Sequence, residues 1–308
     1  MVRTGKSPGS AGVAPRARAA GFASSMLAAV TCLRAAPGMA VCLALPCLFA
    51  CGGQEFTAGS PGTATPDASL DAANGGGPGF CASQPAGLAL CSDFDEQPLP
   101  ENWNDIVANG GSPVSENDAG SVSPPNSLLA STPALSAGEP MTQAFVTKTK
   151  LPAGATHIAF EMRVDELSFP SGAAGASLVP VLYTQRGYEI ILGFVPSPSA
   201  SPFEFDLVEA SLDQLPDGGT TYTAHDLTSL FTQGSGLGEW QSITLDLDID
   251  HGSNAAVVTV GSASSTVTLR PPTGTANGAR TFSLGLQATP PTGETKIRFD
   301  NVTYSAAN

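Results

Sequence analysis

The feature that most constrains this fold is a regular alternation of apolar and polar residues in the second half of the chain. In residues 157–164, HIAFEMRV, the apolar side chains of Ile158, Phe160 and Met162 occupy every second position, and residues 240–250, WQSITLDLDID, repeat this spacing. Successive side chains of a β-strand point to opposite faces of the sheet. The alternation therefore predicts strands that have one buried and one solvated face.

Further segments of the same kind are short and are separated by Gly, Pro, Ser and Asn. They are residues 177–183, 188–195, 255–262, 265–270, 281–288 and 295–304. Many short strands with such turns predict an all-β sandwich or barrel. One short helix is expected at residues 224–231, AHDLTSLF, where Asp226 can cap the first turn. Because no further linker interrupts residues 81–308, we expect them to form a single domain.

The first 50 residues have the composition of an export signal. They include five basic residues and no acidic residue, and an apolar run follows Arg34. Residues 48–51, LFAC, resemble a bacterial lipobox, which implies that Cys51 carries lipid and begins the mature protein. The alternatives are an ordinary secretory signal or a membrane anchor, and translation can also begin at Met26. Gly52 after the lipidated cysteine favours the outer membrane.

Residues 51–80 resemble a flexible tether between the lipid and the domain. They consist mainly of Gly, Ser, Thr, Ala, Pro and Asp, and such a segment buries too little apolar surface to offset the entropy lost on ordering. Beyond the tether, Cys81 and Cys91 form an even pair in an exported chain, which predicts a disulfide. A zinc site is the alternative, but no His lies nearby to complete it.

The charge of the chain excludes one class of partner. All 27 acidic residues follow Cys51, whereas 5 of the 13 basic residues precede it, so the mature chain has a formal net charge of −19. A surface of this charge repels the phosphate backbone, which argues against nucleic-acid binding. Phosphate-binding loops and helical metal motifs are also absent from the sequence.

Three segments, taken in their order along the chain, resemble a known family. Residues 90–103, LCSDFDEQPLPENW, open the domain, residues 240–250 lie in its second half, and residues 296–304, KIRFDNVTY, close it. This order resembles the concanavalin A-like lectin and glucanase sandwiches. The resemblance covers roughly residues 85–305 and implies a jelly roll of two antiparallel sheets, as in lectins and in glycoside hydrolase family 16.

The resemblance to family 16 includes a candidate catalytic motif. Residues 201–210, SPFEFDLVEA, contain Glu204, Asp206 and Glu209 in the spacing E-x-D-x-x-E. In a retaining glycosidase this motif implies that Glu204 is the nucleophile, Glu209 the acid/base and Asp206 the group that modulates the nucleophile. Because Glu209 is out of phase with the other two acids, the motif requires a β-bulge at residues 207–208.

Two observations weigh against catalysis by this motif. Phe203 stands where family 16 usually has Gly, and the domain has only Trp103 and Trp240 as tryptophans that could stack on sugar rings. We therefore expect a monomeric binding protein whose partner is a polysaccharide or an envelope protein. A retaining hydrolase of a β-glucan or galactan is the first alternative, and a structural envelope protein is the second.

The closing strand contains a candidate metal ligand. A β-bulge at Asp300 and Asn301 would return the later apolar residues of this strand to the core. The resemblance implies that Asp300 can hold a structural calcium, and the alternative is that its carboxylate accepts hydrogen bonds from the bulge itself. A second acidic set, Asp246, Asp248 and Asp250, suits either calcium or a solvated strand face. The three histidines, His157, His225 and His251, belong to no recognisable catalytic motif.

Overall fold

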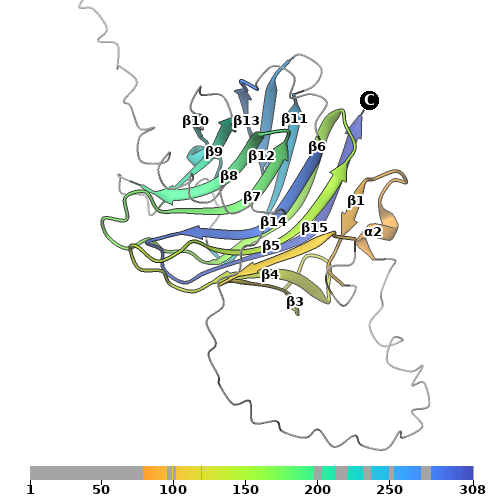
Figure 1. Cartoon of the computed structure of the whole chain (residues 1–308). Helices are drawn as coiled ribbons and strands as arrows, with labels where there is room; N and C mark the ends of the chain where they lie inside the picture. The colour runs from red at the N-terminus through yellow and green to blue at the C-terminus, as the bar shows by residue number, and fades with distance from the viewer. Residues whose placement is uncertain are drawn as a thin grey trace, which may run out of the picture.

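The computed structural model describes residues 79–95, 99, 102–118, 120–197, 203–211, 221–231, 237–249, 253–271 and 279–307. These residues form two antiparallel sheets that face each other, with short helices at the periphery (Figure 1). The predicted all-β class and the two-sheet jelly-roll sandwich are therefore confirmed. The barrel alternative is wrong, because each sheet ends in an unclosed strand at both sides.

The eight-stranded sheet has the order β13-β12-β11-β6-β15-β4-β3, and β1 also pairs with β15. Its strands are β1 (Leu90–Ser92), β3 (Ser112–Asn117), β4 (Asn126–Thr132), β6 (Ala155–Glu166), β11 (Trp240–Asp248), β12 (Ala255–Val260), β13 (Ala263–Thr268) and β15 (Thr295–Ala307).

The seven-stranded sheet has the order β10-β9-β8-β7-β14-β5-β2. Its strands are β2 (Asp105–Asn109), β5 (Thr142–Leu151), β7 (Ser177–Gln185), β8 (Tyr188–Pro196), β9 (Phe203–Ser211), β10 (Thr221–Asp226) and β14 (Arg280–Thr289). The two helices of the described residues are α2 (Phe80–Ser83) and α3 (Thr228–Phe231).

The core lies between the two sheets and is formed by the apolar residues of the alternating segments. Ile158, Phe160 and Met162 of β6 are at most 2% exposed. On the facing sheet, Phe194 of β8 contacts the ring of Phe205 on the neighbouring strand β9, with 5.1 Å between centroids. Burial of these side chains supplies the main favourable term in the stability of the sandwich.

The closing strand β15 contains the predicted β-bulge. Its pairing with β6 shifts register between Asp300 and Thr303, and Asn301 has a φ of 52°. The apolar residues on both sides of this bulge are all fully buried, namely Ile297, Phe299, Val302 and Tyr304. The extra residue has the effect expected of a bulge, because it restores one face for four residues that strict alternation would divide.

At the start of the domain, Cys81 of α2 and Cys91 of β1 are joined by a disulfide, with 5.7 Å between their Cα atoms. The second helix is shorter than predicted. Residues 224–226 belong to β10, because they pair with β9, and α3 begins only at Thr228. Asp226 still accepts a hydrogen bond from the Thr228 amide at 2.9 Å.

Several predictions concern residues outside those that the structure describes. They are the signal at 1–50, the tether with the lipidated Cys51, and the side chains of Asp250 and His251. Among the described residues, neither helix has the length and apolar character needed to span a bilayer.

Candidate functional site

The acidic motif lies on β9, the second strand of the seven-stranded sheet. Phe203, Phe205 and Leu207 point into the core and are at most 7% exposed, as the alternation predicts. Glu204 and Asp206 therefore point to the opposite side of the sheet, which we call the outer face. Val208 and Ala210 continue this outer row and belong to an apolar cluster separate from the main core.

The bulge at residues 207–208 that the motif requires is absent, so strict alternation decides which face Glu209 occupies. β9 pairs with β8 and with β10 in an unbroken register from one end to the other. Glu209 therefore shares the inner face with Leu207, whereas Glu204 and Asp206 lie on the outer face. The arrangement that the catalytic motif requires, with three carboxylates in one row, is therefore not formed.

A retaining glycosidase needs two carboxyl groups about 5–5.5 Å apart on one side of the scissile bond. Glu204 and Glu209 are five residues apart, which corresponds to about 16 Å along the strand, and they point to opposite faces. Glu204 and Glu209 thus do not form the carboxylate pair that this mechanism requires.

Glu209 instead forms the centre of a buried hydrogen-bond cluster, and its residue is 4% exposed. Its carboxylate accepts hydrogen bonds from the Tyr188 hydroxyl and, at 2.6 Å, from the Arg270 amide, and it lies 2.7 Å from His225 Nε2. Burial raises the pKa of Glu209, but the hydrogen bonds from His225, Tyr188 and Arg270 outweigh it and leave the pKa below its ordinary value. The carboxylate is therefore ionised and links β8, β9 and β10 to the segment after β13.

The hydrogen bond between Tyr188 and Glu209 also affects the pKa of Tyr188. Burial, together with the hydrogen bond to Glu209, raises the pKa of the Tyr188 hydroxyl well above its usual range. Tyr188 thus stays protonated and donates to the carboxylate. The inward carboxylate of the motif has a structural role that its spacing alone does not indicate.

The outer face of the seven-stranded sheet has both polar and apolar side chains. Gln143 Nε2 donates to Gln287 Oε1 at 2.9 Å, and the hydroxyls of Thr147 and Ser283 are 3.0 Å apart. At the middle of this face lies an apolar cluster that comprises Phe145, Val179, Ile191, Val208 and Ala210. No other described strand or helix packs over the outer face, because every described strand belongs to one of the two facing sheets.

Four polar side chains on the outer face have little contact with solvent. Gln143, Gln287, Glu189 and Asp206 are each 6% exposed. Among these four, the amides of Gln143 and Gln287 are oriented by the hydrogen bond between them. The two tryptophans do not contribute here: Trp103 is buried in the core, and Trp240 belongs to the other sheet.

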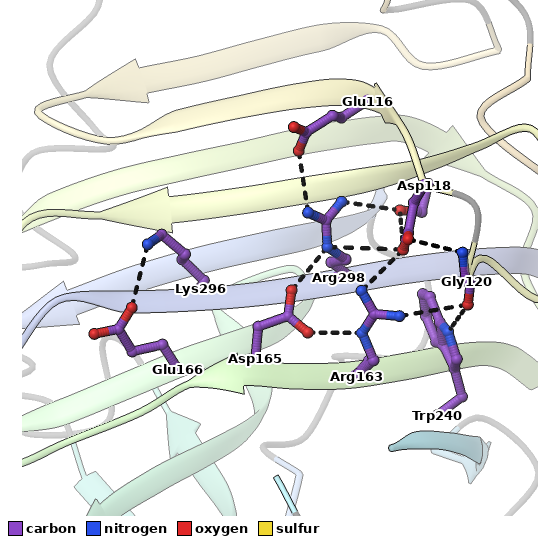
Figure 2. A network of polar contacts seen from close by, with 10 residues as sticks. Glu116, Asp118, Gly120, Arg163, Asp165, Glu166, Trp240, Lys296 and Arg298 are labelled. Atoms are coloured by element: carbon purple, nitrogen blue, oxygen red, sulfur yellow. Dashed lines mark hydrogen bonds and ion pairs between the residues drawn. The ribbon is translucent and has the colours of Figure 1, made fainter. Parts of the chain in front are cut away.

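A second polar cluster, which sequence reasoning missed, lies on the outward side of the eight-stranded sheet (Figure 2). Arg163 donates to Asp118 at 2.9 Å and to Asp165 at 2.6 Å. Arg298 donates to Asp165 at 2.7 Å and to Glu116 at 3.2 Å. Arg163 thus pairs with two carboxylates and Arg298 with three, because Asp118 also lies 3.8 Å from Arg298, and the cluster joins segments far apart in the sequence.

Trp240 attaches one more segment to this cluster. The Arg163 guanidinium lies 4.9 Å from the centre of the Trp240 ring, and the indole N–H donates to the Gly120 carbonyl at 2.5 Å (Figure 2). Neither arginine has a sequence signal beyond its outward position on a strand. Only the pairing of the strands brings these residues together.

Asp300 is completely buried, and both of its carboxylate oxygens accept hydrogen bonds. The donors are the Ser123 amide, the Ser123 hydroxyl and the Asn301 amide, each at 2.8 Å. Burial raises the pKa of Asp300 to about 6, against the effect of these hydrogen bonds. The Asn301 amide belongs to the bulge, as the alternative expects, whereas the two Ser123 donors come from the connection between β3 and β4.

The other acidic set is also engaged by protein groups. Asp246 lies 2.6 Å from His157 Nδ1, and Asp248 accepts a hydrogen bond from Ser253 at 2.5 Å. Within the described part of the chain, no group of three or more His, Cys, Asp or Glu side chains is arranged to hold a metal ion.

Comparisons with known proteins bear on the fold. No protein-family profile matches the sequence, and no curated protein is similar to it. Among solved structures, this chain is similar to a glycoside hydrolase family 16 protein of Bacteroides ovatus in complex with a mixed-linkage glucan product. The superposition has a TM-score of 0.50 and 8% sequence identity, and it covers 70% of this chain and 99% of that chain. An endo-β-1,4-glucuronan lyase from the fungus Trichoderma reesei has a TM-score of 0.46 and 12% identity over 68% of this chain and 92% of its own. The first of these similarities confirms the jelly-roll sandwich that the sequence resemblance implied.

Proposed function

We propose that this protein is an exported, lipid-anchored protein of the bacterial cell envelope whose β-sandwich binds a polysaccharide. The binding surface is the outer face of the seven-stranded sheet. The observation that carries this proposal is the set of four polar side chains, each 6% exposed, on a sheet face that no described strand or helix covers.

The chemistry of the outer face suits sugar hydroxyls. The amides of Gln143 and Gln287 offer donors and acceptors, and the carboxylates of Glu189 and Asp206 accept hydrogen bonds. The apolar cluster around Phe145 provides a surface for the C–H groups of a sugar ring. Because β5 and β14 hold the amides in place before binding, little side-chain entropy is lost when a ligand arrives.

The choice of first ligand follows from the fold. The Bacteroides ovatus protein with this fold was solved with a mixed-linkage glucan product, which makes β-glucans the first polysaccharides to test. The hydrolase alternative lacks support from the motif, because Glu204 and Glu209 point to opposite faces of β9.

The experiment measures binding of the full chain to an array of β-glucans and galactans, followed by calorimetry with the best ligand. We expect the double variant Gln143→Ala/Gln287→Ala to weaken binding at least about tenfold, because each lost hydrogen bond contributes about 1 kcal/mol. Thr244→Ala, on the outward side of the other sheet, is the matched control and should bind like the wild type.

Release of reducing sugars is measured on the same ligands. Binding without turnover supports the proposal. Absence of binding to every polysaccharide, or equal binding by the double variant, contradicts it. Turnover that disappears in Glu204→Gln while the fold is retained would replace it with the hydrolase alternative.

A further inference from the structure

Apart from the three-residue β1, which pairs only with β15, the two sheets of the sandwich have four edge strands, and three of these carry residues that discourage pairing with another chain. β3 contains Pro113 and Glu116, β2 begins at Asp105, and β10 ends with His225 and Asp226. Proline and charged side chains are the usual protection of exposed sheet edges. The fourth edge, β13, has the sequence ASSTVT and contains neither.

The backbone of β13 is regular, and no described strand pairs with its outer side. It pairs with β12 in an unbroken register, from Val260 opposite Ala263 to Ala255 opposite Thr268, so no bulge twists the edge away. Within the described residues, no further strand pairs with it. The side chains of Ser264, Thr266 and Thr268 are exposed, while Val267 packs in the core and fixes the orientation of the strand.

The interior of this end of the sandwich is already closed. α3 lies between β9 of one sheet and the β12–β13 pair of the other, and its Leu230 and Phe231 are part of the core. β10 and β13, the last strands of the two sheets, lie at the same end of the molecule (Figure 1). The apolar core is thus protected at this end, and the backbone of β13 is the part that stays available for pairing.

The charge distribution around β13 favours a second copy of this chain as the partner. The chain has a net charge of −14, so two copies repel each other over most of their surfaces. Around β13 this repulsion is small, because the outward residues of β12, namely Ala255, Val257 and Thr259, are also uncharged. The nearest outward carboxylates on the sheet are on β11, two strands away, which is about 10 Å and comparable with the screening length at physiological salt.

We propose that β13 pairs antiparallel with β13 of a second copy of this chain, which gives a two-fold symmetric dimer with one continuous sheet. Symmetric pairing places Ser and Thr side chains opposite one another, and such cross-strand pairs are favourable. A six-residue edge buries less surface than a standard interface, so the dimer is weak and depends on concentration. This proposal replaces the monomer expected from the sequence, and it is independent of the proposed sugar-binding function.

Sedimentation velocity of the full chain, from about 1 µM to about 1 mM, tests the proposal. We expect a concentration-dependent shift from monomer to dimer. In the symmetric dimer, Thr266→Lys places two positive charges opposite each other. This variant should therefore abolish the shift to dimer without lowering the melting temperature of the monomer. Thr244→Lys on β11 adds the same charge to an inner strand and should leave the dimer unchanged.

Cross-linking provides the second readout. Thr266→Cys and Ser265→Cys place single free thiols on β13, and mild oxidation should give covalent dimers from at least one of them, whereas Thr244→Cys should give none. A wild-type chain that stays monomeric throughout the concentration series overturns the proposal. So does a dimer that forms equally well in Thr266→Lys, because its interface must then lie elsewhere.

Discussion

At the scale of single residues, the acidic motif contains two glutamates, Glu204 and Glu209, that point to opposite faces of one strand. Glu204 and Glu209 differ by an odd number of residues, and in an unbroken strand such residues point to opposite faces. Glu204 thus lies on the outer face, whereas Glu209 is enclosed by His225, Tyr188 and the Arg270 amide. The motif therefore combines one surface carboxylate with one structural carboxylate.

This division predicts that the same substitution affects stability at Glu209 but not at Glu204. Glu209→Gln should lower the free energy of unfolding at pH 7 by about 1–3 kcal/mol, because it replaces a buried, hydrogen-bonded carboxylate with a neutral amide. Glu204→Gln should change the stability very little. Chemical denaturation of both variants beside the wild type measures this difference, and equal stability of the two variants would contradict the roles assigned here.

The pH dependence of the Glu209→Gln effect has a definite sign. The pKa of Glu209 in the folded protein lies below its ordinary value of 4.5, so the unfolded chain takes up the proton more readily. The stabilisation is fully present above pH 4.5 and is lost as the pH falls through the folded pKa. The stability difference between wild type and Glu209→Gln should therefore shrink in acid.

At the scale of elements, the connection from β3 to β4 lies across the outward side of the eight-stranded sheet. Asp118 is held by Arg163, the Gly120 carbonyl accepts from Trp240, and Ser123 donates to Asp300 (Figure 2 shows the first two contacts). These contacts come from β6, β11 and β15. The connection is thus fixed by three strands that are distant in sequence, which restricts its motion relative to the sheet.

Removal of Arg163 should loosen this connection. Its side chain is 14% exposed, and Arg163→Ala leaves Asp118 and Asp165 with one cation fewer. We expect a loss of about 1–3 kcal/mol in the free energy of unfolding and faster amide hydrogen exchange in residues 120–123.

Lys296→Ala is the matched control, because the ion pairs of Lys296 with Glu166 and Glu294 are exposed and should contribute little. Hydrogen exchange followed by mass spectrometry reports on the connection itself. Unchanged exchange at residues 120–123 in Arg163→Ala would show that the cluster does not hold this segment.

At the scale of the whole molecule, the proposed arrangement is a sandwich attached to a membrane by lipid and a tether. The disulfide between Cys81 and Cys91 lies where the tether would enter the domain, and it links α2 to β1. The formal charge of −19 expected for the mature chain keeps the domain away from anionic surfaces. Both features suit a domain that faces an oxidising compartment and acts at a distance from its anchor.

The lipid anchor has a direct test. Cys51→Ser should abolish lipidation and move the protein from the membrane fraction to the soluble fraction, because in the proposed arrangement the lipid on Cys51 is the attachment. Fractionation and mass spectrometry of the N-terminus measure the two effects. Membrane association that persists after cleavage at the usual site would refute the lipobox assignment.

The sequence by itself determined the fold class, the buried residues and the bulge near Asp300. Alternation with period two is a local property, since the apolar residues of each strand must face the core wherever that strand lies in the sheet. Ile158 and Phe205 could therefore be assigned to the core, and the apolar residues after Asn301 required an extra residue in β15.

The tertiary structure alone decided the register of β9 and the neighbours of each polar side chain. Whether a strand bulges depends on its pairing with both adjacent strands, and β8 and β10 hold β9 in an unbroken register that local sequence does not specify. The partners of Arg163 and Glu209 come from distant parts of the chain, such as Asp118, Trp240 and Arg270. Contacts of this kind are set by the order of strands in the sheets, and that order follows from packing of the whole core, which no single segment contains.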